Sequence, residues 1–160
     1  MVYFYGVILF GGLCWLSWID LKTLTLPDLY IYPLLVLGFS YAYLLKDEPL
    51  ASMSGAAMGY CVFVAIELIF KAVRQKAGLG RGDAKLLAVG GAWCGIFSLP
   101  LIVALSSVSA LIILLILRTG KDEAIPFGPF LSFAIFSTWM FLSGIIGNDL
   151  FEFSNALITH

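Results

Sequence analysis

The segment KAGLGRGDAK (residues 76–85) is the most polar and most glycine-rich part of an otherwise apolar chain. Its three glycines allow a sharp turn or the close approach of another chain. An uncharged run begins directly afterwards at Leu86, so Asp83 stands where a loop enters a buried or membrane helix. The exposed N–H groups of a helix start stabilise a carboxylate there. Taken alone, Asp83 is better explained as a helix N-cap after a glycine turn than by a functional role.

Asp20 supplies a second carboxylate in matching surroundings. It is the first charged residue of the chain and ends the apolar segment 1–19. One aspartate therefore closes an apolar segment and another opens a later one. If both helix ends lie on the same side of a membrane, the two carboxylates can meet at the same depth.

The composition is that of an integral membrane protein. Hydrophobic residues make up 61% of the chain and charged residues 12%, and the mean hydropathy is +1.02. Soluble domains are closer to half apolar and a quarter charged. The 160 residues have room for about six or seven spans of roughly 20 residues. A net charge of −1 excludes a nucleic-acid binder that works through a basic surface.

The cysteines and the single histidine do not form a metal-binding pattern. Cys14, Cys61 and Cys94 lie far apart within apolar segments, and His160 is the last residue. Buried thiols commonly fill space in a core, so we expect no metal site and no other cofactor.

The hydropathy pattern predicts an all-α integral membrane protein, a bundle of six transmembrane helices in one domain covering 1–160. The uncharged run from Leu86 to Leu117 would form a helix of about 48 Å, too long for a hydrocarbon core of about 30 Å. Pro100 marks the expected break between two shorter helices. The predicted spans are about 2–19, 29–45, 51–70, 84–98, 101–117 and 128–147.

Two features of the third span are notable. Gly55 and Gly59 form a small-xxx-small pattern, which lets helix backbones approach closely in lipid. Glu67 lies one turn from the charged end of the span, where a snorkelling or cavity-facing carboxylate is expected rather than a catalytic one.

The distribution of Lys and Arg predicts the orientation. Eight of the nine fall in the first, third and fifth loops or beside them, and only Lys46 lies on the other side. The positive-inside rule assigns the side with more positive charges to the cytoplasm. Asp20 and Asp83 are then both at the cytoplasmic surface, and both chain ends face outward.

Two carboxylates at one place suggest acid–base chemistry. Close carboxylates share one proton because ionising both is costly. The ionised one can take a proton from water while the protonated one polarises a carbonyl, as in aspartic proteases. We expect the helix N-terminus to hold Asp83 ionised, although a coupled pair titrates as a unit.

Three segments of the chain resemble the bacterial type IV prepilin peptidases, which are membrane aspartic proteases of the GxGD kind. They are Asp20 with the Leu-Pro-Asp that ends at Asp28, GRGDAKLLA (residues 80–88) and IPFGPFL (residues 125–131). The resemblance covers nearly the whole chain, in order and spacing. It implies catalytic Asp20 and Asp83, and removal of short basic leaders from prepilins or pseudopilins at the cytoplasmic face of the bacterial inner membrane.

Several further residues are expected to support this site. Asp28 fits either a turn-forming role or a role in holding the active-site loop. Lys85 fits either orienting the site or facing lipid headgroups, and we favour the headgroups. The remaining candidates are the two glycines before Asp83 and the residues that shape the start of the last span, namely Gly80, Gly82, Pro126, Gly128 and Pro129.

The chain departs from the larger members of that family, which carry an N-terminal cytoplasmic segment with paired cysteines linked to N-methylation. We therefore interpret it as a minimal peptidase form, and the sequence leaves N-methyltransferase activity open. The alternative is a non-enzymatic polytopic protein, such as a small transporter or an assembly subunit of a secretion or pilus machine. A transporter would place its ionisable residues in mid-membrane on broken helices, whereas these aspartates lie at helix ends.

Overall fold

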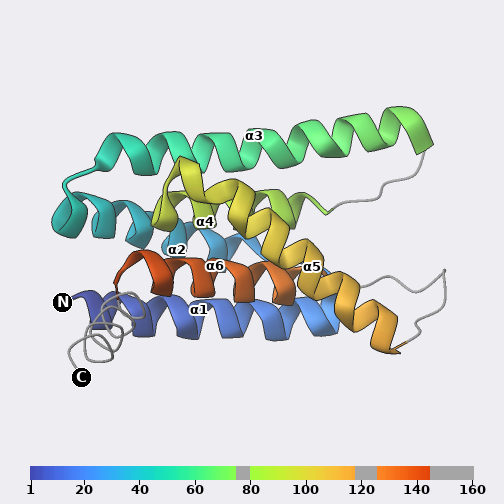
Figure 1. Cartoon of the computed structure of the whole chain (residues 1–160), viewed down its shortest axis with the longest axis horizontal. Helices are drawn as coiled ribbons and strands as arrows, with labels where there is room; N and C mark the ends of the chain where they lie inside the picture. The colour runs from blue at the N-terminus through green and yellow to red at the C-terminus, as the bar shows by residue number, and fades with distance from the viewer. Residues whose placement is uncertain (75–79, 118–125, 145–160) are drawn as a thin grey trace, which may run out of the picture.

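The computed structural model describes residues 1–74, 80–117 and 126–144, without the side chains of 69–74 and 117. The described residues form helices and no strands (Figure 1). This confirms the all-α expectation. The elements are α1 (Val2–Thr23), α2 (Asp28–Tyr41), the π-helical turn η1 (Ala42–Lys46), α3 (Pro49–Arg74), α4 (Arg81–Cys94), the 3-10 turn η2 (Ile96–Ser98), α5 (Leu99–Leu117) and α6 (Gly128–Leu142).

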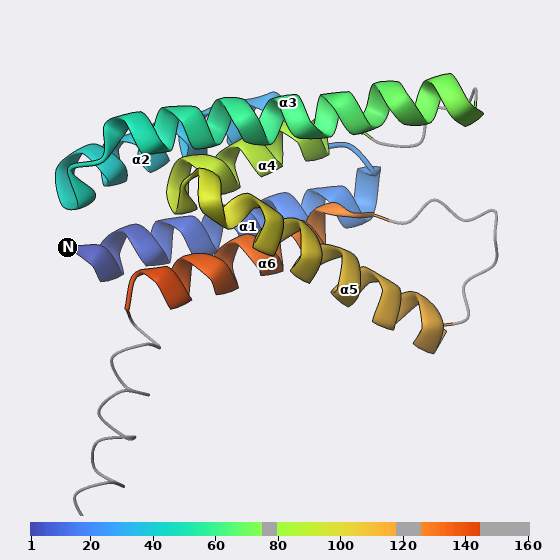
Figure 2. The ribbon, with the colours of Figure 1, turned by 45° about the horizontal axis from the view of Figure 1, so that its top comes forward.

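Successive helices run up and down, so that alternate connections lie at the same end of the bundle (Figures 1 and 2). The C-terminal ends of α1, α3 and α5 lie at one end, together with the N-terminal ends of α2, α4 and α6. Asp20 and Asp83 therefore lie at the same end, as the loop pattern predicts. The segments 75–79 and 118–125, which carry several of the counted charges, are outside the described residues.

Four stretches of helix are long and apolar enough to cross a membrane: Val2–Thr23, Asp28–Lys46, Pro49–Leu68 and Ile96–Ile116. The surfaces of α1 and α5 carry large exposed apolar side chains, among them Phe4, Trp18 and Leu115. Such a surface is unusual for a soluble monomer and typical of contact with lipid. The chain is a multi-pass membrane protein.

Helices α4 and α6 are shorter than a full span, with 14 and 15 residues. The break between α4 and α5 falls at Gly95, which has a φ of 82°, a conformation that glycine adopts without strain. Pro100 instead lies inside the first turn of α5, where a proline is tolerated. Two helices are found where two were predicted, but the glycine rather than the proline separates them.

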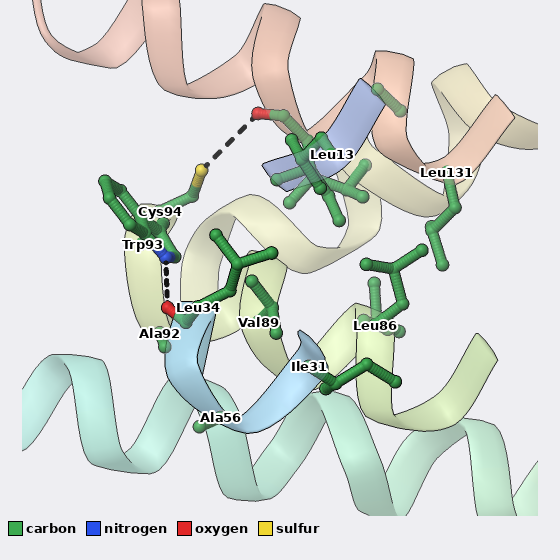
Figure 3. Close-up of a cluster of buried hydrophobic side chains, with 14 of the residues drawn as sticks. Leu13, Ile31, Leu34, Ala56, Leu86, Val89, Ala92, Trp93, Cys94 and Leu131 are labelled. Atoms are coloured by element: carbon green, nitrogen blue, oxygen red, sulfur yellow. Dashed lines mark hydrogen bonds between the residues drawn. The ribbon is translucent and has the colours of Figure 1, made fainter. Parts of the chain in front are cut away.

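Helix α4 forms the centre of the bundle. Every residue from Leu86 to Cys94 is buried, and a helix that is apolar on all sides belongs in a core. Trp93 donates an indole hydrogen bond of 2.8 Å to the carbonyl of Leu34 on α2 (Figure 3). Ser52 on α3 donates another, of 2.6 Å, to the carbonyl of Ala92. These contacts fix the helix that carries Asp83.

The contact between α3 and α4 depends on glycine. A Cβ atom on Gly91 would collide with the carbonyl of Gly55, and one on Gly59 would lie 2.8 Å from the carbonyl oxygen of Leu87. The predicted close approach through the Gly55–Gly59 pattern is confirmed, with α4 as the partner helix.

Replacing Gly91 with alanine is therefore expected to destabilise the bundle by about 1–3 kcal/mol, the usual cost of overpacking. Backbone, rather than a flexible side chain, blocks the added methyl group, so α3 and α4 must move apart. Thermal unfolding in detergent measures the effect. Gly11→Ala is the matched control, because a Cβ atom there meets nothing within 4 Å; equal melting temperatures for the two variants would contradict the packing argument.

Candidate active site

Asp20 occupies the last turns of α1 but faces the protein. Only 5% of its surface is exposed, although neighbouring residues such as Leu21 and Lys22 are exposed. Its carboxylate oxygen Oδ2 accepts a hydrogen bond of 2.9 Å from the backbone N–H of Gly128. Because a charged acceptor strengthens such a bond, the contact stabilises the ionised form of Asp20.

Gly128 begins α6 and lies directly against this carboxylate. A Cβ atom at this position would lie 2.6 Å from Oδ2 and 3.0 Å from Cγ of Asp20, so only glycine fits without displacement. Pro129 follows in the first turn of α6, where its missing N–H costs nothing. Pro126 lies just before the helix. The start of α6 thus packs beside Asp20.

Asp83 is the third residue of α4 and is partly buried. The N-cap of α4 is Gly80, with no side-chain capping bond, so Asp83 is not the N-cap that the sequence allows. Its backbone N–H donates to the carbonyl of Gly80 at 3.1 Å. Its side chain is therefore not used in capping and is available for other contacts.

The pKa of the Asp83 carboxyl is shifted upward from its ordinary value. Asp83 lies just before the predicted span 84–98. Burial is the larger cause that raises the pKa of its carboxyl to about 6, and the negative charge of Asp20 is the smaller one. Burial therefore outweighs the helix N-terminus in setting this pKa. A carboxyl with a pKa of about 6 is still mostly ionised at neutral pH, so the ionised Asp83 expected from the sequence stays a prediction. Asp83 therefore binds its proton at a pH closer to neutral than an ordinary aspartate does. Because the charge of Asp20 contributes to this shift, the two carboxyls interact.

The two glycines before Asp83 differ in what they do. A Cβ atom on Gly82 would lie 2.8 Å from Cβ of Leu26, so glycine lets the start of α4 pack on the loop between α1 and α2. Gly80 is exposed, has an ordinary φ of −76° and has room for a Cβ atom, 3.7 Å from Asp83 Oδ2. The sequence did not predict a role for Leu26 as the packing partner of Gly82. The signal that could have found it is an apolar residue within a polar loop, and Leu26 is buried in the structure.

Asp28 and Lys85 form an ion pair that joins α2 to α4. The Lys85 ammonium lies 2.6 Å from both carboxylate oxygens of Asp28. The side chains remain 26% and 50% exposed for Lys85 and Asp28 respectively. Lys85 thus contacts Asp28, and the ion pair ties the start of α2 to the start of α4.

Asp28→Asn and Lys85→Met are each expected to lower turnover in a cleavage assay by no more than about tenfold. Partly exposed ion pairs contribute about 1 kcal/mol or less, and neither group contacts the carboxyls of Asp20 and Asp83 in any described bond. The double variant should lose little more than either single one, because both changes remove the same contact. If Asp28→Asn were as inactive as Asp20→Asn, Asp28 would belong to the chemistry instead.

Glu67 and the three cysteines differ in their exposure. Glu67 is 6% exposed on α3, so it faces protein and does not snorkel toward the surface. Cys14 and Cys61 are exposed and Cys94 is buried. Among the described residues, no three His, Cys, Asp or Glu side chains lie close enough together to hold a metal ion.

The chain is similar in sequence to known proteins. Residues 7–115 match the family described as the type IV leader peptidase family. The chain is 37% identical to a prepilin leader peptidase/N-methyltransferase of Neisseria gonorrhoeae over 128 residues. It is 41% identical to one of Stutzerimonas stutzeri over 135 residues and 40% identical to one of Pseudomonas aeruginosa over 137 residues.

These alignments cover 79–80% of this chain and 45–46% of the relatives. The chain thus spans about half the length of the curated relatives it matches. No solved structure matches it.

Proposed function

Because the chain belongs to the type IV leader peptidase family, we propose that it is a membrane-embedded aspartic endopeptidase in which Asp20 and Asp83 act as one catalytic unit. The observation that supports this most is the pairing of two buried or partly buried carboxyls at one end of the bundle, one hydrogen-bonded to Gly128 and one with a raised pKa.

In this mechanism Asp20 is the base and Asp83 the acid. Asp20, which accepts the Gly128 N–H bond, takes a proton from a water molecule while the oxygen of that water attacks the scissile carbonyl carbon. Asp83 gives its proton to the carbonyl oxygen, so the tetrahedral intermediate is a neutral diol. Collapse of the diol breaks the C–N bond: Asp20 gives its proton to the leaving amine, and Asp83 takes a proton back from one diol hydroxyl, whose oxygen becomes the carbonyl oxygen of the new carboxyl group. The step needs neither a metal nor a nucleophilic side chain.

The proposed substrates are prepilins or pseudopilins, from which the enzyme would remove a short basic leader that ends just before an apolar helix. The names of these relatives include an N-methyltransferase activity. We limit the proposal to the peptidase, because the carboxyl pair accounts for hydrolysis and no methyl-transfer chemistry follows from it.

Membrane transport is the weaker reading. A transporter would need ionisable groups at mid-membrane depth, and the aspartates of the candidate site lie at helix ends on one side of the bundle. A transporter hypothesis would rely on Glu67 as its ionisable residue within a span. Glu67 lies on α3, a different helix from those that carry the two aspartates.

The proposed location is the inner membrane, with the site facing the cytoplasm. The uneven distribution of Lys and Arg supports this orientation. A cysteine introduced at Thr119, in the fifth loop and outside the described residues, is expected to react with a membrane-impermeant maleimide only when the reagent reaches the cytoplasmic side. A cysteine at Asp47, at the opposite end, should react only from outside. The reverse pattern would place the carboxyl pair on the wrong side for this proposal.

Incubating the detergent-purified protein with a prepilin and following the loss of the leader by mass tests the function directly. Cleavage at a single bond before the apolar segment is the expected result. An intact prepilin, with protein shown to be folded, would refute the peptidase assignment.

A further inference from the structure

Helices α1 and α6 lie side by side on the outside of the bundle (Figures 1 and 2). An apolar furrow is lined by side chains of these two helices. Two hollows, of about 310 Å³ and 440 Å³, make up this furrow and share Phe10 and Phe136. The first reaches Leu21 and Pro129, the chain neighbours of Asp20 and Gly128. The second reaches Tyr3 and Met140 at the other end of the same two helices. The furrow therefore leads along the bundle to the candidate active site.

The furrow has the length of a membrane span. From Tyr3 to Leu21 the helix rises 18 residues, roughly 27 Å at about 1.5 Å per residue, and a bilayer core is about 30 Å thick. Its rim is open to lipid, since Phe10, Trp18 and Phe133 are 52%, 57% and 63% exposed. A transmembrane helix matches this length and this surface.

In the half of the furrow nearest the candidate active site, one buried polar group has no hydrogen-bond partner within the described part of the chain. Serine hydroxyls in membrane helices usually bond to a carbonyl of the preceding turn, and Ser17 on the α1 wall does so with Leu13 at 2.8 Å. Ser132 on the α6 wall is 4% exposed, and its hydroxyl has no hydrogen-bond partner within the described part of the chain. It lies four residues, about 6 Å, from Gly128 along α6.

We propose that the furrow holds the apolar helix that follows the scissile bond of the substrate, and that Ser132 donates a hydrogen bond to a main-chain carbonyl where this helix is unwound. The proposal rests on the peptidase function above. A peptide bond within a helix is shielded from attack, so the substrate must be extended near Asp20 and Asp83. Its freed carbonyls are costly in an apolar setting unless a donor meets them. An acyl chain of a lipid offers no acceptor at this depth and would leave Ser132 unpaired.

Photo-crosslinking tests the position of the substrate. The probe is a synthetic prepilin-like peptide with a short basic leader directly before a 20-residue apolar segment. It is reconstituted in liposomes with the Asp83→Asn variant so that it stays intact. Benzoylphenylalanine at position 133 is expected to capture the probe. The same residue at Leu115 on α5, which is 70% exposed and lies at the same end, should capture only lipid. Capture of lipid alone at position 133, or equal capture of the probe at both positions, would overturn the docking site.

Substitution of Ser132 tests the hydrogen bond. Ser132→Ala is expected to reduce kcat/KM for the probe about threefold to tenfold, as for loss of one hydrogen bond, while Ser132→Thr keeps the hydroxyl and most of the rate. Ser54→Ala, on the exposed face of α3, is the control without loss. An unchanged rate for Ser132→Ala would remove Ser132 from the proposal. Cleavage of the probe by the unmodified protein distinguishes failure of the docking site from failure of the peptidase function. If the probe is cleaved but not captured at position 133, only the docking site is wrong. If the probe is not cleaved, the peptidase function itself is wrong.

Discussion

Replacing either Asp20 or Asp83 with asparagine is expected to lower prepilin cleavage by about 10³-fold or more, the upper part of the range for a lost acid–base group. Asparagine keeps the size of the side chain but cannot take a proton from water or deliver one to the scissile carbonyl. The measurement is the initial rate of leader removal by purified variants whose circular dichroism and elution volume match those of the unmodified protein.

The double variant separates a catalytic unit from two independent contributions. Residues that act as a unit are strongly non-additive, so Asp20→Asn combined with Asp83→Asn should be no slower than either change alone. Glutamate at either position should restore little cleavage activity, because the added methylene group moves the carboxyl away from its catalytic position. A folded Asp20→Asn or Asp83→Asn variant that cleaves at near the normal rate would exclude the two-aspartate mechanism.

Gly128→Ala is expected to reduce cleavage by about 10²-fold while the bundle stays folded. The added Cβ atom would lie 2.6 Å from Asp20 Oδ2, so either the carboxylate or the start of α6 must move. A displacement of about 1 Å at a catalytic group costs on the order of 10²-fold. The same shift would weaken the 2.9 Å hydrogen bond from the Gly128 N–H, which stabilises the ionised form of Asp20.

Two other glycine substitutions serve as controls for this result. Gly11→Ala lies on the same helix as Asp20 but meets nothing within 4 Å, so it should retain full activity. Gly80→Ala has room for its methyl group, so any loss of rate there, with normal stability, would reflect the approach of substrate rather than folding. Equal activity of Gly128→Ala and Gly11→Ala would show that the contact with Asp20 does not matter for turnover.

The sequence alone determined the fold class and the end of the bundle at which the aspartates lie. The run of apolar segments and the exclusion of polar backbone from lipid leave few structures besides helices. Charges cluster in alternate loops, so the positions of Asp20 and Asp83 at one end follow from counting helices. Gly55 and Gly59 also signalled a close helix contact, because small residues at this spacing have no other evident purpose in a membrane helix.

Only the tertiary structure decided what contacts each site residue makes. Gly128 is 108 positions from Asp20 along the chain, and Lys85 is 57 positions from Asp28, so no local pattern could pair them. The raised pKa of Asp83 depends on burial and on the charge of Asp20, whereas the sequence shows only the adjacent helix start. Local spacing and hydropathy set where helices begin and what surrounds them, but side-chain ionisation and contact depend on which helices pack together.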